Sequence, residues 1–368
     1  MFSNAPRLFK SVFFILILYL TVFLVILPQN CLSAAKEGID MCLNTVIPSL
    51  FPFFVCSGLL SASGFSIMCG KILSPFMRPL FRLPGASALT FLLGTVSGYP
   101  VGAASASELY ESGQCTKNEA ERMIAFCNNS SPLFVIGVVG TGFLGNPSLG
   151  YLLYASHIIS ALIVGIIFRF YGNASSSNRK TLPPSTSPRS KKNVILSFGG
   201  IIDSSVSSTL KVCGFIIFFS VFSEAIPENF LKPYICSLTE ISGGLLSLTQ
   251  ATPSHNMLLP LISFFLGFSG LSILLQITSI TSPKGLSAKL LIPGKILQGV
   301  ISCIMTLFLT KIFPISQPTS TFPQTNFMDA FSASDLILSA ILSTFFVIMI
   351  LKGVMHLSFL FSGRNTHN

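Results

Sequence analysis

The residues best suited to binding chemistry lie inside an apolar run from position 86 to position 106. The centre of that run reads Gly94-Thr-Val-Ser-Gly-Tyr-Pro-Val-Gly102. Its three glycines, four positions apart, form a bare stripe on a helix, which lets a second backbone approach closely in a membrane. Pro100 removes an amide donor and strains a helix at its middle. Backbone freed at membrane depth is tolerated only inside protein or beside a polar cavity. The run therefore predicts a broken membrane segment that forms half of a binding site.

Four residues at this break are predicted to contact a substrate. Ser97 offers a hydroxyl, Gly98 a freed amide, and Tyr99 an aromatic face beside Pro100. The alternative is that the glycine stripe only packs helices together. The adjacent proline favours a binding site, because a simple packing motif needs no break.

A second polar group stands before a half-length apolar run at residues 133–144. Asn128, Asn129 and Ser130 supply several hydrogen-bond donors there. The N-terminus of a half-helix favours an anion, because its amides and its dipole both present positive charge. A surface turn or a helix cap is the alternative interpretation.

Glu240 is the polar residue that stands out in the second half of the chain. It lies in an apolar hairpin, residues 234–249, that is too short to cross a membrane. An intramembrane carboxylate is costly and indicates a functional site. Glu240 could bind a cation or a proton for coupling, or it could pair with Lys211 or Lys295.

A glycine-interrupted run at residues 257–280 supplies the last candidates. Ser269 and Gly270 mark its interruption, and Gln276 follows six residues later. Gln276 suits a contact with a ligand and a hydrogen bond between helices equally well. Together with Glu240, this segment is predicted to form the wall opposite Tyr99.

The remaining polar residues fit no catalytic or metal-binding pattern. Glu121 and Arg122 are expected to form a solvated pair, and His157 lies on an apolar helix with no partner in view. The Gly-x-Gly-x-x-Gly pattern at 140–145 lacks a βαβ unit, and the cysteines lack Cys-x-x-Cys spacing. We therefore expect no enzymatic activity, no metal and no cofactor.

Composition assigns the chain to the membrane. Of its 368 residues, 51% are hydrophobic and only 9% are charged, and the mean hydropathy is +0.74. A soluble domain carries about 25% charged residues, so this chain lacks the means to build a water-facing surface. The net charge of +10 comes from basic residues between apolar runs, which is typical of cytoplasmic loops rather than of nucleic-acid binding.

Charge and hydropathy predict the order of segments. Basic residues before the first apolar run place the N-terminus inside; a cleaved signal peptide is the alternative for that run. Residues 193–208 are expected along the membrane interface and residues 210–226 as a span. The expected organisation is a first span in 1–40, a first repeat in 41–171, a basic cytoplasmic linker in 172–193, a second repeat in 194–313, and an external loop with a last span and an internal C-terminus in 314–368.

The two halves of the chain share short apolar patterns of opposite expected orientation. Phe91-Leu-Leu-Gly-Thr-Val-Ser-Gly98 resembles Phe265-Leu-Gly-Phe-Ser-Gly270. The charge rule directs the run after Met41 inward and the run after Leu210 outward. An inverted pair with interrupted segments is typical of a secondary transporter. The predicted fold is an all-α polytopic membrane protein, an inverted-repeat bundle with broken helices and re-entrant hairpins.

Several longer motifs resemble a known family. They are Leu50-Phe-Pro-Phe-Phe54, Pro75-Phe-Met-Arg-Pro-Leu-Phe-Arg-Leu-Pro-Gly85, Ser97-Gly-Tyr-Pro-Val-Gly-Ala103, Asn118-Glu-Ala-Glu-Arg122 and Phe126-Cys-Asn-Asn-Ser-Ser-Pro-Leu-Phe134. The chain resembles the sporulation integral membrane protein YlbJ family, within the nucleoside-recognition or Gate group. That resemblance implies an endospore-forming bacterium, the mother-cell-derived membrane around the forespore, a fold similar to concentrative nucleoside transporters, and dipicolinate as cargo.

The resulting expectation is a carrier of a small planar anion, most specifically of dipicolinate moved toward the forespore. Its aromatic ring would stack on Tyr99, and its carboxylates would meet amide and hydroxyl donors. Two alternatives stay open: a membrane scaffold or assembly factor for the spore envelope, and a nucleoside-type transporter. The expected partners are the substrate and the lipid bilayer, with no nucleic acid; a coupling ion and an oligomer are left open.

Overall fold

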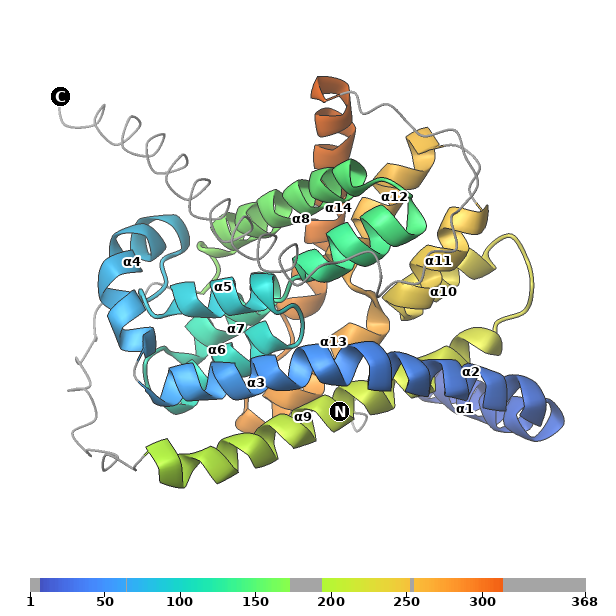
Figure 1. Cartoon of the computed structure of the whole chain (residues 1–368), viewed down its shortest axis with the longest axis horizontal. Coiled ribbons are helices and arrows are strands. Elements are labelled where there is room, and N and C mark those ends of the chain that lie inside the picture. Colours follow the sequence, from blue (N-terminus) through green and yellow to red (C-terminus); the bar gives the residue numbers. More distant parts are fainter. Residues whose placement is uncertain (1–6, 64, 173–193, 252–254, 314–368) are drawn as a thin grey trace.

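The computed structural model describes residues 7–63, 65–172, 194–251 and 255–313, and the regular elements of these ranges are all helical (Figure 1). The elements are α1 (Arg7–Ile26), α2 (Pro28–Met41), η1 (Cys42–Val46), α3 (Ile47–Ala62), α4 (Phe65–Phe81), α5 (Ser87–Val96), α6 (Val101–Glu111), α7 (Lys117–Phe126), η2 (Leu133–Phe143), α8 (Pro147–Phe168), α9 (Val194–Glu224), α10 (Lys232–Thr239), α11 (Ile241–Ala251), α12 (His255–Phe268), α13 (Gly270–Thr281), η4 (Ser282–Lys284) and α14 (Leu291–Ile312).

Four stretches in the described ranges are long and apolar enough to cross a membrane. They are Pro147–Phe168, Phe198–Glu224, Met257–Lys284 and Leu291–Ile312. A fifth candidate joins Ile17–Ile26 to Pro28–Asn44 through a bend of 105°. The chain is thus a polytopic helical membrane protein, as its composition predicts. The expected last span at 336–357, the external loop and most of the basic linker lie outside the described residues.

Two helix pairs fold back on themselves. In α5 and α6, Thr90 Oγ1 lies 3.0 Å from Ser105 Oγ. In α10 and α11, a Cβ built on Gly244 would lie 2.3 Å from the backbone of Ser237, so the second arm touches the first. Within the chain between Arg82 and Arg169, the α5–α6 pair thus has the hairpin shape that a re-entrant segment requires.

Two further segments are broken without folding back. The segment from α12 to α13 is interrupted at Ser269 yet keeps one direction, because Met257–Lys284 reads as a single span. The segment from α7 to η2 is interrupted between Cys127 and Pro132. The sequence predicted breaks at all four of these places.

Helix α9 differs from expectation. An interfacial stretch and a separate span were expected at 193–208 and 210–226, but Val194–Glu224 is one helix of 31 residues. The physical reason is that no proline occurs between these positions, and a single Gly214 within the apolar part does not stop a helix.

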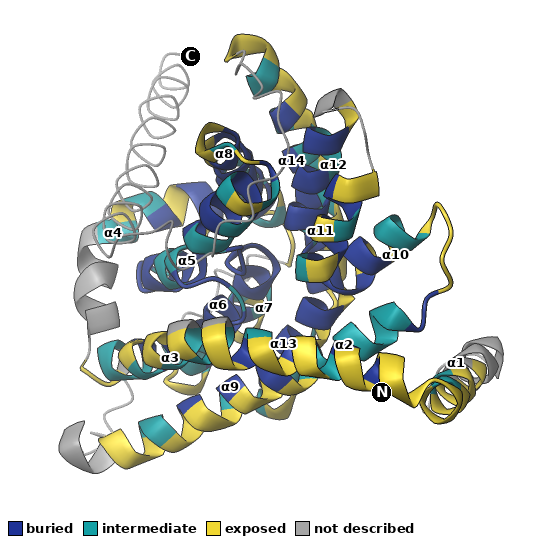
Figure 2. Cartoon of the chain, turned by 45° about the vertical axis from the view of Figure 1, so that its right-hand side comes forward, coloured by how far each residue is buried: buried dark blue, intermediate teal, exposed yellow. Residues whose placement is uncertain are grey.

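The core is shared by both halves of the chain. One continuous hydrophobic cluster runs from Met77 in α4 to Leu291 in α14. Helix α12 packs on α14, and α14 packs on α8. Figure 2 shows buried residues concentrated in α5 to α8 and in α11 to α14, whereas α1 and α9 expose much of their length.

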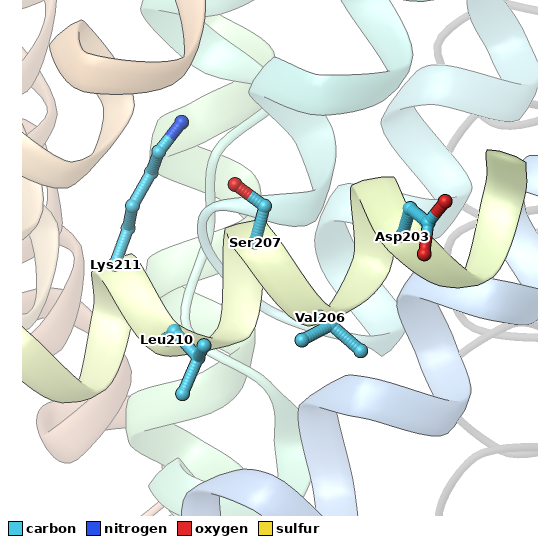
Figure 3. A pocket seen from close by; sticks show the side chains of 5 residues that line it. All are labelled: Asp203, Val206, Ser207, Leu210 and Lys211. Atoms are coloured by element: carbon cyan, nitrogen blue, oxygen red, sulfur yellow. The ribbon is translucent and has the colours of Figure 1, made fainter.

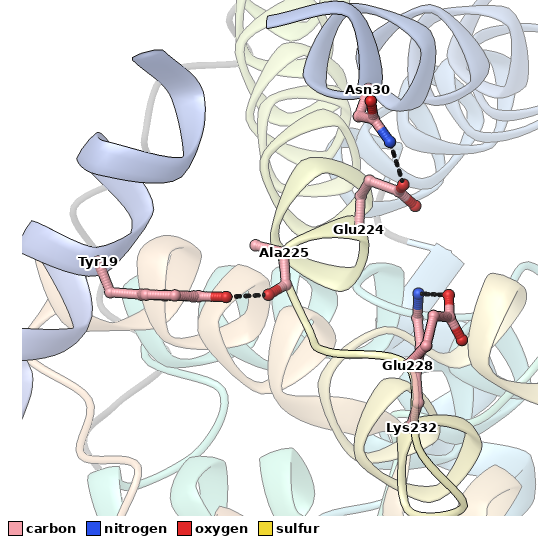
Figure 4. Close-up of polar contacts among 6 residues, drawn as sticks. All are labelled: Tyr19, Asn30, Glu224, Ala225, Glu228 and Lys232. Carbon is pink, nitrogen blue, oxygen red and sulfur yellow. Dashed lines mark hydrogen bonds and ion pairs between the residues drawn. The ribbon is translucent and has the colours of Figure 1, made fainter. Parts of the chain in front are cut away.

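Helices α1 and α2 attach to the end of α9 (Figure 4). The Tyr19 hydroxyl donates to the Ala225 carbonyl at 2.6 Å, and the Asn30 amide donates to Glu224 at 3.2 Å. In the turn that follows, Lys232 pairs with Glu228. These contacts fix the outer layer of helices, so that α5 to α8 and α10 to α14 are left to build the centre.

Candidate functional site

The α5–α6 hairpin turns at the residues that the sequence singled out. Ser97 ends α5, Gly98 has a φ of +89°, and Pro100 precedes the first residue of α6. A Cβ on Gly98 would lie 3.2 Å from the Cβ and the amide nitrogen of Ser131. Glycine is required here both by the backbone conformation and by the neighbouring chain.

The glycine stripe lets the end of α7 dock between the two arms of the hairpin. A Cβ on Gly94 would lie 1.8 Å from the Cys127 carbonyl oxygen, and one on Gly102 would lie 2.1 Å from it. Gly94 and Gly102 pack against backbone, as the packing interpretation predicts, and the break between them brings Tyr99 beside Ser130. A binding role of the break stays a prediction.

Asn128 and Asn129 hold the break after α7. Asn128 Oδ1 accepts from the Ala103 amide at 2.7 Å, and its Nδ2 donates to the Ile124 carbonyl at 2.7 Å. Asn129 donates through its backbone amide to the Gly94 carbonyl at 3.2 Å. Both side chains are fully buried, so the surface-turn interpretation is wrong.

Tyr99 joins the two halves of the chain. Its hydroxyl lies 2.5 Å from Ser130 Oγ. The Ser269 hydroxyl and the Glu240 carboxylate also lie within interaction range of the Tyr99 hydroxyl. Three other predicted residues, each from a different broken element, therefore lie around the Tyr99 phenol group.

Helix α14 supplies two site residues that the sequence interpretation did not include. Lys295 Nζ donates to the Asn128 carbonyl and, at 2.9 Å, to Gln298 Oε1. Gln298 Nε2 in turn donates to Asn129 Oδ1 at 2.9 Å. The Lys295 ammonium also lies 6.0 Å from the centre of the Tyr99 ring. Lys295 was considered only as a partner of Glu240.

The signal for these residues was present in the spacing of polar side chains along α14. Lys295, Gln298, Ser302 and Thr306 recur at helical intervals of three or four, and all four are fully buried. Ser302 Oγ and Thr306 Oγ1 each lie 2.7 Å from Ser263 Oγ of α12. A polar stripe on an otherwise apolar helix indicates the face that points into the bundle.

His157 has a partner, contrary to expectation. Its Nε2 accepts a hydrogen bond from the Ser130 amide at 3.0 Å, so the ring proton resides on Nδ1. His157 Nδ1 finds no partner among the described residues. The ring is fully buried on α8 and supports the same segment that Lys295 contacts.

Glu240 caps its own helix. Its carboxylate accepts from the amides of Ser242 at 3.0 Å and Gly243 at 2.8 Å, at the start of α11. The ion pairs between described residues do not include Glu240. The alternative pairing with Lys211 or Lys295 is therefore wrong, because Lys295 bonds to Asn128 and Gln298 instead.

The other predicted residues of the second half do not all lie at the site: Ser269 and Gly270 do, whereas Gln276 bonds within its own helix. Ser269 and Gly270 both have positive φ, and a Cβ on Gly270 would touch Ile241 of the hairpin at 3.5 Å. Gln276 is buried, but its amide donates to Ser272 within α13 at 3.2 Å. Hydrogen bonds between described residues do not join Gln276 to Tyr99. Ser97 is buried, and its hydroxyl lacks a partner among the described residues.

Glu121 and Arg122 do not form the expected solvated pair. Arg122 is 8% exposed and donates to the carbonyls of Phe81, Arg82 and Arg169, whereas Glu121 accepts from the Ser287 amide at 2.8 Å. The two side chains point to different neighbours because they follow each other on α7, where adjacent residues face different sides.

A surface groove on α9 is separate from these residues. Figure 3 shows it lined by Asp203, Val206, Ser207, Leu210 and Lys211, all from the one helix. The charged side chains of Asp203 and Lys211 lie at its two ends. None of these side chains belongs to the cluster around Tyr99 and Lys295.

Comparison with known proteins identifies a matching family model and related proteins. A sequence model described as "Gate: Nucleoside recognition" matches residues 43–147, which include the α5–α6 hairpin and the break after α7. An uncharacterized protein of Alkalihalophilus pseudofirmus is 31% identical over 129 residues, covering 34% of this chain and 27% of that protein. No solved structure matches.

The sporulation integral membrane protein YlbJ of Bacillus subtilis is 33% identical over 330 residues, which cover 80% of this chain and 81% of that protein. A match of this length draws on both halves of the helical bundle. On this basis the chain belongs to the YlbJ family of sporulation integral membrane proteins.

Proposed function

We propose that this protein transports a small anionic metabolite, and that dipicolinate moved toward the forespore is its cargo. The observation that carries the proposal is Lys295, a fully buried ammonium group at the meeting point of the broken segments. The ion pairs of the described residues include no carboxylate bound to Lys295. A buried charge is stable only when it is paired and hydrogen-bonded.

The hydrogen bonds that Lys295 makes to described residues do not use all of its donors. An ammonium group has three hydrogen-bond donors. The Asn128 carbonyl and Gln298 Oε1 take two of them. The Asn128 carbonyl lies just past the C-terminal end of α7, where the helix dipole is negative and favours a cation. Among the described residues the third donor has no hydrogen-bond partner, and a substrate carboxylate bound to it would neutralise the charge in a medium of low dielectric constant.

The neighbours of Lys295 suit a planar aromatic acid. The Tyr99 ring lies beside the ammonium, and the hydroxyls of Ser130 and Ser269 lie beside the phenol. A flat ring could stack on Tyr99 while its carboxylates reach Lys295 and the hydroxyls. The name of the Bacillus relative supports a membrane role in sporulation; dipicolinate as cargo and the membrane around the forespore are our proposal.

Uptake into proteoliposomes tests the proposal. The full chain is reconstituted, and entry of labelled dipicolinate is compared with entry of labelled uridine. We expect saturable dipicolinate uptake and a loss of at least about tenfold in Lys295→Gln, since a buried charged hydrogen bond contributes about 1.5–3 kcal/mol. Lys289→Gln removes an exposed lysine just before α14 and should leave uptake unchanged.

Two alternatives have distinct outcomes in the same assay. Saturable uridine uptake without dipicolinate uptake would favour a nucleoside transporter, which the matched Gate description supports. A scaffold or assembly factor would be favoured if the reconstituted protein took up neither compound, while both the wild-type protein and Lys295→Gln restored sporulation in cells. Either outcome contradicts the anion transporter.

A further inference from the structure

Two arginine side chains share one aromatic ring at the end of α8. The guanidinium carbon of Arg82 lies 5.3 Å from the centre of the Phe170 ring, and that of Arg169 lies 5.0 Å from it. Each distance is within the range of a cation–π contact. One ring partly offsets the charge of each cation, but it leaves two like charges gathered at one place.

A third arginine, Arg122, is buried and bonds to the backbone of both Arg82 and Arg169. Arg122 Nη2 donates to the Arg82 carbonyl at 2.8 Å, and Arg122 Nη1 donates to the Arg169 carbonyl at 3.2 Å. It thereby ties the loop after α4 to the end of α8. Arg122 thus caps one carbonyl at the C-terminus of α8 and the carbonyls of Phe81 and Arg82 at the end of α4, a role that the side chains of Arg82 and Arg169 do not have to fill.

Arg82 occupies a backbone position that usually belongs to glycine. Its φ is +50°, and the amide of Leu83 donates to the Met77 carbonyl at 3.3 Å, as expected for a left-handed residue that ends a helix. A side chain kept in a strained backbone conformation indicates a functional constraint on that side chain. Glycine would end α4 more easily, but it would supply no guanidinium group.

The three arginines lack a matching acid. The ion pairs between described residues include none of them. Glu119 is the acidic group within electrostatic range of Arg122, and its carboxylate already accepts from the amide and the hydroxyl of Thr116 in a capping box. Within the described ranges, the buried Nε donors of Arg122 and Arg169 have no hydrogen-bond partner.

We propose that Arg82 and Arg169 form a binding site for the phosphodiester of an anionic phospholipid, with Phe170 between them. Guanidinium groups match phosphate oxygens in geometry and charge. The site lies directly after the span Pro147–Phe168, where hydrocarbon gives way to headgroups. Three side chains here are apolar or aromatic and yet exposed, namely Ile167 at 43%, Phe170 at 67% and Tyr171 at 53%. A soluble phosphate needs no such surface, whereas the acyl and glycerol parts of a lipid do.

Native mass spectrometry of the full chain tests the site. The protein is purified in a neutral detergent, and its retention of phosphatidylglycerol is compared with that of phosphatidylcholine. We expect the wild-type chain to retain phosphatidylglycerol preferentially, and the double variant Arg82→Gln with Arg169→Gln to lose at least about tenfold in apparent affinity. Arg78→Gln is the matched control, because Arg78 is exposed one turn earlier on α4 and should leave retention unchanged.

A second measurement separates a lipid from a soluble anion and from misfolding. Thermal unfolding of the wild-type chain is recorded with phosphatidylglycerol, with phosphatidylcholine and with inorganic phosphate. We expect phosphatidylglycerol alone to raise the unfolding temperature, and this rise to be absent in the double variant, whose unfolding temperature without lipid should match that of Arg78→Gln. Equal protection by inorganic phosphate would overturn the lipid assignment. Unchanged phosphatidylglycerol retention in the double variant would overturn the site itself.

Discussion

The two halves of the bundle contain the same sequence of elements but stabilise their breaks differently. The first half has the α5–α6 hairpin, the broken segment from α7 to η2, and the long helix α8. The second has the α10–α11 hairpin, the broken α12–α13 segment, and the long helix α14. In the first half, buried asparagines bond to the freed backbone. In the second, a carboxylate cap and two residues with positive φ serve instead.

This difference indicates that the candidate site is complete only when both halves are present. The first half supplies Tyr99, Asn128 and Ser130 but no buried cation among them, and the second half supplies Lys295. By element order, the α5–α6 hairpin corresponds to the α10–α11 hairpin. The short sequence match instead compared Phe91–Gly98 with Phe265–Gly270. The opposite orientation of the halves stays a prediction.

The largest effect is expected from substitutions that disrupt the close packing of the two hairpins. In Gly94→Ala the new methyl group would overlap the Cys127 carbonyl, and in Gly244→Ala it would overlap the Ser237 backbone. We expect each variant to lose about 3 kcal/mol or more of stability, since backbone cannot yield as a side chain does. Thermal unfolding in detergent measures this. Gly199→Ala, with open space around its Cβ, should be neutral or stabilising, and equal melting of all three would contradict the packing.

A smaller loss is expected from the asparagine that connects the halves. Asn129→Ala removes the bonds of its side chain to Gln298 and to the Phe126 carbonyl. We expect about 2 kcal/mol of destabilisation from the buried groups left unpaired, and a loss of most dipicolinate uptake. Asn146→Ala removes only a cap of α8 and should cost about 1 kcal/mol with uptake retained. Normal spore dipicolinate with well-expressed Asn129→Ala would refute this residue's role.

The corresponding change in the second half is expected to be milder. Glu240→Ala removes the acceptor for two amides at the start of α11, and loss of such a cap costs about 1 kcal/mol. Glu240→Gln keeps one acceptor oxygen and should cost about half as much. The unfolding temperatures of the two variants measure these losses of stability. A loss as large as that of Gly244→Ala would mean that Glu240 does more than cap its helix.

A similarly small loss of stability is expected at the hydroxyl that touches both halves. Tyr99→Phe removes the contacts with Ser130 and Ser269 but keeps the ring. We expect about 1 kcal/mol of destabilisation and a change of about threefold or less in the half-saturating concentration for uptake. Tyr99→Ala, which removes the stacking surface as well, should reduce uptake much further. Equal uptake by both variants would exclude a stacking role.

The breaks in the helices could be predicted from the sequence, but the position of the Lys295 ammonium group at the site could not. A helix break depends on the backbone preferences of the residues at the break, which can be read from the sequence. The breaks here were predicted from Gly98, Pro100, Ser269 and Gly270. The Asn128–Lys295 contact joins residues 167 positions apart, and no local preference specifies such a pair. The periodic polar stripe of α14 would have identified the inward face, although not the partner. His157 was misjudged for the same reason, since its partner is a backbone amide on another segment.

The most direct test of the account is calorimetric binding of dipicolinate to the purified full chain and to Lys295→Gln. Lys295 comes from the second half and bonds to the first, so its charge should be required for the joined site to hold an anion tightly. We predict saturable binding by the wild-type chain and a dissociation constant at least about tenfold higher in Lys295→Gln, equivalent to about 1.4 kcal/mol. Equal affinity of the two proteins for dipicolinate, with both folded, would contradict the central claim.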